Sequence, residues 1–199
     1  MKATRVIFII IWALAIQFDQ AQAQQFGVKT CKLTVKGTSS IHDWESTVEK
    51  METKGSIAVA NNTLQNVGDV VVKIPVKSIK SPKGKMMDNK TWDAFDHEKN
   101  PLITFSLTNK KINAGNKTLD ATGTLTMAGV TRAIDLKLGY KILSDGLIQI
   151  TGSKKLKMTD FKMDPPTAMM GTIKVGDEVE VAFEMVLTFE SETALMNKK

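Results

Sequence analysis

The chain has 199 residues, 27 basic and 21 acidic side chains, a formal net charge of +6, and one cysteine, Cys31. This length predicts one domain with a sizeable core, and a single cysteine excludes an internal disulfide, so we expect a buried, inert thiol. The basic residues are interleaved with acidic ones and form no run with aromatics. That pattern argues against nucleic acid as a partner and leaves only a weak, transient contact with a membrane surface.

The first 23 residues predict a secretory signal peptide. Basic residues precede an uncharged run, 6–17, and a small-x-small cleavage pattern ends at Ala23. The run is too short to span a bilayer core of roughly 30 Å. We therefore expect cleavage of residues 1–23, a single domain over 24–199 with a core of about 29–190, and a periplasmic or secreted product.

After this leader, most of the chain alternates apolar and polar residues, which is typical of half-buried strands. The clearest runs, in chain order, are 32–37, 69–79, 102–108, 123–140, 147–158 and 178–190. Pro75 interrupts the second run and predicts an edge, a bulge or a bend there.

Two stretches break the alternation. Residues 80–100 predict one short helix, with Trp92 and Phe95 at a helical spacing, and residues 158–177 predict one long, methionine-rich loop. About eight strands, one helix and one loop indicate an all-β fold, either a closed sheet or a sandwich.

The residues that usually carry catalysis or bind metals do not form a known motif. His42 and His97 are the only histidines, and neither stands at a metal-ligand spacing. No nucleophile elbow and no phosphate-binding glycine loop is present. The sequence therefore predicts no enzyme activity, no catalytic residue, no metal and no cofactor.

Five stretches, in this order and spacing, resemble the YceI family of secreted lipid-binding proteins. They are SSIHDWES (39–46), VKIPVKSIKS (72–81), NPLITFSL (100–107), GTLTMAGVTRAIDL (123–136) and DEVEVAFEM (177–185). The resemblance implies an elongated, eight-stranded antiparallel barrel, lipocalin-like in plan, whose apolar bore holds an isoprenoid or similar lipid in the periplasm. The segment 85–100 departs from the family, which often carries a charged, Asp-rich helix there.

Alternating apolar positions and the resemblance together predict a carrier whose bore is lined by alternate residues. The candidate ligand-binding residues are Val72, Ile74, Ile103, Phe105, Leu125, Ile134, Leu136, Leu138, Ile150, Val181, Phe183 and Met185. Polar side chains at the barrel mouth, His42, Trp92 and Arg132, are candidates for orienting a head group.

Two other functions stay open at this point. One is an enzyme or stress-response factor that acts on a small apolar substrate. The other is a structural module of the cell envelope, in which the same apolar residues fill a solid core.

Overall fold

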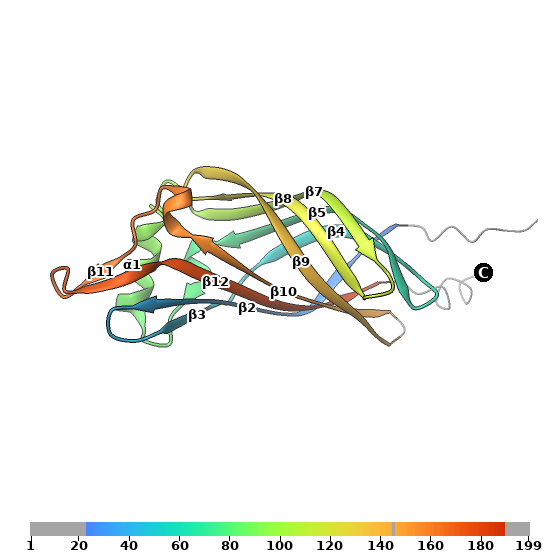
Figure 1. Cartoon of the computed structure of the whole chain (residues 1–199), viewed down its shortest axis with the longest axis horizontal. Helices are drawn as coiled ribbons and strands as arrows, with labels where there is room; N and C mark the ends of the chain where they lie inside the picture. The colour runs from blue at the N-terminus through green and yellow to red at the C-terminus, as the bar shows by residue number, and fades with distance from the viewer. Residues whose placement is uncertain (1–22, 145, 190–199) are drawn as a thin grey trace, which may run out of the picture.

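The computed structural model describes residues 23–144 and 146–189. Residues 1–22 of the predicted signal peptide and the end of the chain after Phe189 lie outside the described residues. Over the described part, the chain forms twelve strands, one α-helix and two short 3₁₀ helices (Figure 1). Their bounds are β1 (Gln24–Gln25), β2 (Gly27–Ser39), β3 (Trp44–Val48), β4 (Glu52–Ala60), β5 (Thr63–Pro75), η1 (Val76–Ser78), β6 (Ile79–Lys80), α1 (Lys85–Ala94), β7 (Leu102–Asn113), β8 (Thr118–Met127), β9 (Val130–Ser144), β10 (Leu147–Lys157), η2 (Met158–Phe161), β11 (Thr167–Ala168) and β12 (Ile173–Thr188).

The strands form one strongly curled sheet. Its order is β1-β4-β5-β7-β8-β9-β10-β12-β2-β3-β6, with β11 added beside β12, and the pairings among the described strands are antiparallel. Figure 1 shows an elongated tube with α1 and the β11–β12 hairpin at one end. The β4–β5, β7–β8 and β9–β10 turns lie at the other end. The predicted all-β, antiparallel fold with one short α-helix is confirmed.

The prediction of eight strands is not confirmed, because two long segments are interrupted. Strand β5 ends at Pro75, and a 3₁₀ turn over 76–78 separates it from β6. Proline has no N–H to donate to a ladder, so the predicted bend occurs there. A second break, at 49–51, separates β3 from β4. The predicted long loop also contains η2 and β11.

The two breaks meet at a seam that holds the curl of the sheet. Strand β3 lies near one end of the sheet order and β4 near the other, yet only residues 49–51 separate them. The two ends must therefore lie close together. The hydroxyl oxygen of buried Ser78 lies 2.9 Å from Lys50 O and 2.7 Å from Pro75 O, so these two carbonyls share its single donor, and Glu49 N donates to Ser78 O (2.9 Å).

Helix α1 is fixed to the adjoining strand by three polar contacts. The buried Asp88 carboxylate accepts from Ser81 N (2.7 Å) and from Lys80 Nζ (3.2 Å). The Trp92 indole donates to Ile79 O (3.1 Å). Among the described residues, no helix is long and apolar enough to cross a membrane, and α1 itself has ten residues.

Cys31 differs from the expectation of a buried thiol, because it is exposed. Residues 27–33 of β2 pair with β12, whereas the described pairing of β2 with β3 covers only residues 34–37. Cys31 therefore has a described partner strand on one side only, and the opposite side admits solvent.

Two packed clusters occupy the two ends of the tube. The first lies toward the β4–β5 and β9–β10 turns and contains Ile57, Leu64, Val67, Leu119, Ala121, Tyr140, Ile148, Ile150 and Leu187. The second lies toward η2 and contains Leu125, Met127, Met158, Phe161, Met163 and Val179. Apolar burial in these two clusters stabilises the curled sheet.

Candidate ligand-binding cavity

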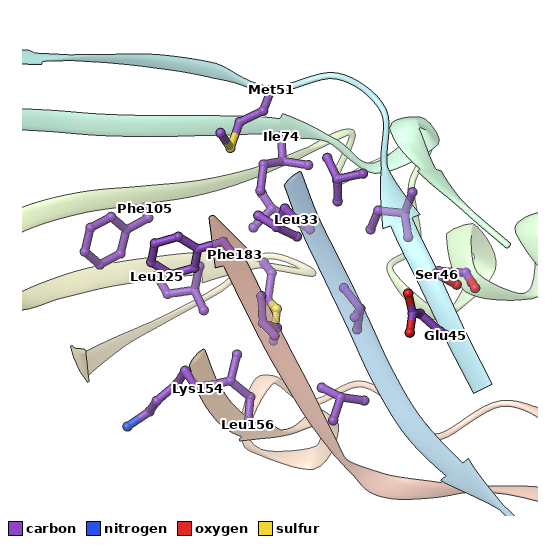
Figure 2. A pocket seen from close by; sticks show the side chains of 18 of the residues that line it. Leu33, Glu45, Ser46, Met51, Ile74, Phe105, Leu125, Lys154, Leu156 and Phe183 are labelled. Atoms are coloured by element: carbon purple, nitrogen blue, oxygen red, sulfur yellow. The ribbon is translucent and has the colours of Figure 1, made fainter. Parts of the chain in front are cut away.

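A cavity of about 620 Å³ runs inside the curled sheet. This volume falls within the range of roughly 300–1,000 Å³ that is usual for ligand pockets. Figure 2 shows Leu33, Ile74, Leu125 and Phe183 converging on the same space, whereas the Lys154 ammonium points away from them. The interior is therefore hollow and apolar.

Strand register explains why these side chains meet. Successive residues of a strand point to opposite faces, and directly paired residues of antiparallel strands share a face. Phe183 on β12 is paired with Leu33 on β2 and with Gly152 on β10. A Cβ on Gly152 would lie 2.5 Å from Leu138 Cδ2 and 3.0 Å from Phe183 Cζ, so glycine leaves room for two lining side chains.

The structure places all twelve predicted ligand-binding residues on the wall of this cavity. They are Val72, Ile74, Ile103, Phe105, Leu125, Ile134, Leu136, Leu138, Ile150, Val181, Phe183 and Met185. Their contact with a ligand stays a prediction.

The three residues predicted at the mouth do not lie together. His42 lines the open end of the cavity. Trp92 and Arg132 are not among the lining residues, and their polar groups bond to protein instead: Trp92 to Ile79 O, and Arg132 Nε to Asp160 O at 2.9 Å. Of these three residues, only His42 stays a candidate for contact with a head group.

The sequence did not predict the lining residues that lie in helix α1, in the loop after η2 and at the start of β12. Helix α1 contributes Met87, Thr91 and Ala94, whose spacing puts them on one helical face. The loop after η2 contributes Pro166, and Ile173 follows at the start of β12. The helical spacing was a usable signal for α1, and the methionine-rich composition favoured core filling or an apolar lid for the loop, but it did not single out Pro166 or Ile173.

Polar groups are few along the cavity and concentrate at its open end, where His42, Asp43, Lys83 and Lys90 line the wall. Deeper inside, the hydroxyl of Thr53 is buried and has no hydrogen-bond partner. In the part of the chain that the structure describes, no group of three or more His, Cys, Asp or Glu could hold a metal ion. The arrangement suits a long apolar molecule with one polar end at the mouth.

One electrostatic contact joins η2 to β12 beside this open end. Thr159 donates to the Asp177 carboxylate from its hydroxyl (2.7 Å) and from its backbone N–H (2.9 Å). These hydrogen bonds favour the charged carboxylate and lower the pKa of Asp177 below its ordinary value of 3.8.

Comparison with solved structures finds the same fold in several bacterial proteins. BcnA of Burkholderia cenocepacia aligns with a TM-score of 0.64 and 19% identity, over 78% of this chain and 95% of that protein. A polyisoprenoid-binding domain from Saccharophagus degradans, implicated in plant cell wall breakdown, aligns with a TM-score of 0.62 and 15% identity, over 82% and 97% of the two chains. The YCEI protein of Campylobacter jejuni aligns with a TM-score of 0.59 and 22% identity, over 73% and 85%. At these identities the likeness concerns the fold.

Among curated proteins, no significant match was found. The family model of the YceI-like domain matches residues 15–187, which include nearly all the described strands and the whole cavity wall. The chain belongs to the YceI-like domain family.

Proposed function

We propose that this protein is a carrier that binds an isoprenoid or a similar long amphiphilic chain in its cavity. The observation that carries this proposal is the apolar hollow of about 620 Å³, which is built from alternate residues of the sheet. The fold shared with a polyisoprenoid-binding domain supports the same ligand class.

Burial alone can drive such binding if the chain is long enough. Each ligand CH₂ removed from water contributes roughly 0.8 kcal/mol, while the loss of translational and rotational freedom costs about 4–15 kcal/mol. A ligand that buries ten such groups gains about 8 kcal/mol, which exceeds the low end of that cost but not its high end. We therefore expect affinity to rise steeply with chain length.

Binding, not catalysis, is the role that the wall favours. The side chains that converge deep in the cavity, such as Phe105, Leu125 and Phe183, offer no nucleophile and no general base. The polar groups at the open end are suited to orienting a head group.

Native mass spectrometry of freshly purified protein, followed by organic extraction, tests the proposal. We expect a co-purifying lipid, and we expect the delipidated protein to bind isoprenoid alcohols with an affinity that rises with chain length. A protein that is empty as isolated and binds none of these alcohols would refute the carrier function.

We also propose that the carrier is exported, because the leader pattern ends at Ala23. Intact mass measurement of the protein from a periplasmic or secreted fraction should give a chain that begins at Gln24. A chain that keeps its leader and stays in the cytoplasm would refute export.

A further inference from the structure

Three segments surround the open end of the cavity, and we call them the rim: residues 39–43, 81–90 and 166–174. Each segment contributes lining residues, among them Ile41, Met86 and Thr167. In Figure 1, α1 and the β11–β12 hairpin lie together at this end of the tube. Lys90 Nζ donates to Thr167 O (2.8 Å), so the helix and the hairpin are joined.

The rim exposes large apolar side chains. The exposed fractions are 61% for Ile41, 71% for Met86 and 73% for Met169, and Met170 is fully exposed at 108%. Of the described residues, only three other large apolar side chains are exposed, and none exceeds 44%. Apolar surface gathered at one end of a protein usually marks a surface that binds something.

The backbone conformation at the tip of the β11–β12 hairpin does not favour methionine. Met169 and Met170 have φ values of +51° and +55°, which lie in the left-handed region. Glycine and asparagine adopt this region easily, whereas methionine does so at a cost. A turn closed by Thr172 N donating to Met169 O would therefore be more stable with asparagine at either position. Stability does not account for two exposed methionines there.

The charge of the three rim segments is mostly positive. Apart from the buried Asp88, the charged side chains of the rim are four lysines and one aspartate: Lys83, Lys85, Lys90, Lys174 and Asp43. Exposed apolar side chains surrounded by lysines suit an anionic phospholipid surface, because the apolar groups enter the acyl boundary and the lysines face the phosphates.

We propose that the rim docks on an anionic phospholipid bilayer, with Met169 and Met170 inserted and the cavity opening onto the lipid surface. Docking goes beyond the carrier function, because it requires no cargo. It would bring the mouth of the cavity to the place where a lipid could enter or leave.

Vesicle flotation of the mature, delipidated protein tests the docking. We expect the protein to float with vesicles of phosphatidylcholine and phosphatidylglycerol, to float less as salt is added, and to float little with phosphatidylcholine alone. Replacing both tip residues, Met169→Asn with Met170→Asn, should weaken binding to the anionic vesicles at least tenfold. The same variant should melt no lower than the wild type, because asparagine suits the left-handed backbone.

Two controls separate the tip from general effects. Leu143→Asn removes an exposed apolar side chain of β9 at the opposite end and should leave flotation unchanged. Lys83→Glu with Lys85→Glu should abolish the preference for anionic vesicles. Wild-type protein that does not float, or a double asparagine variant that floats as well as wild type, would overturn the proposal.

Sedimentation in the absence of vesicles tests whether the rim binds a second copy of the protein instead of a membrane. If the double asparagine variant loses self-association and the wild type does not bind vesicles, the rim is an interface between copies, and membrane docking is refuted. Native mass spectrometry without vesicles reports cargo separately. A variant that keeps its cargo but no longer floats supports docking, whereas an empty wild type that floats refutes only the carrier function.

Discussion

Enlarging one wall side chain should distinguish a hollow interior from a filled one. Val181 lies on β12, paired with Val35 and Lys154, and its side chain lines the cavity. Val181→Phe adds four carbon atoms to that wall. If they displace an equal length of ligand chain, the lost burial is about 3 kcal/mol, or more than a hundredfold in affinity.

The same variant should have a different effect on folding. In a hollow tube the added ring enters empty space, so the free energy of unfolding should stay the same or rise. In a filled core it would overpack its neighbours and lower that free energy by about 1–3 kcal/mol.

A matched control exists on the same strand. Val186 is not among the lining residues, and its place in the alternation of β12 puts it on the outer face, so Val186→Phe makes the identical change outside the cavity. Binding of a long isoprenoid alcohol, measured by titration, and urea unfolding should both be recorded for the two variants. If Val181→Phe lowers stability by 1–3 kcal/mol and leaves binding intact, the reasoning about the cavity is wrong.

Three further changes test the seam, the contact beside the open end and the exposed thiol. Ser78→Ala should lower the urea-derived free energy of unfolding by about 1–3 kcal/mol, because Lys50 O loses a buried donor; unchanged stability would contradict the seam. The lowered pKa of Asp177 stabilises the fold above its unfolded value of 3.8, and this contribution is lost as pH falls through the lower folded value. Thr159→Ala removes the hydroxyl donor but keeps the backbone N–H donor, so it should reduce that acid dependence in thermal melts, and an unchanged acid profile would argue against the side-chain contact. Cys31 is exposed, so its alkylation should go to completion. Partial burial of the thiol raises the pKa of Cys31 above 9.0, so the alkylation rate should still rise beyond pH 9.0. A rate that reaches its plateau below that pH would contradict the raised pKa.

The inward-facing residues were the most predictable part of this protein. The alternation of β12 from Val179 to Leu187 was visible in the sequence, and Val181, Phe183 and Met185 all line the cavity. The pattern was sufficient because a strand has only two faces, and the apolar one must avoid water.

The number of strands was less predictable. Alternation continues across Pro75 and Val76, but whether proline there bends the chain or merely marks an edge depends on partners elsewhere in the sequence. In the structure the chain bends after Pro75, and a hydrogen bond between Ser78 and Lys50, which are far apart in the sequence, stabilises the bend. Trp92 was similarly ambiguous, because its indole could face a ligand or a backbone carbonyl, and Ile79 O is its partner.

A hollow interior also limits where stability can come from. Side chains around an empty space lose the dispersion contacts that a filled core would give them. Here the two packed clusters and the backbone ladders of the sheet must hold the fold. A bound chain would contact both the wall and the inner side chains of these clusters, such as Ile57 and Leu125, and would stabilise the folded state in proportion to the logarithm of its concentration over Kd. Ligand binding in the cavity should therefore raise the free energy of unfolding, because it restores the dispersion contacts that the wall side chains lack.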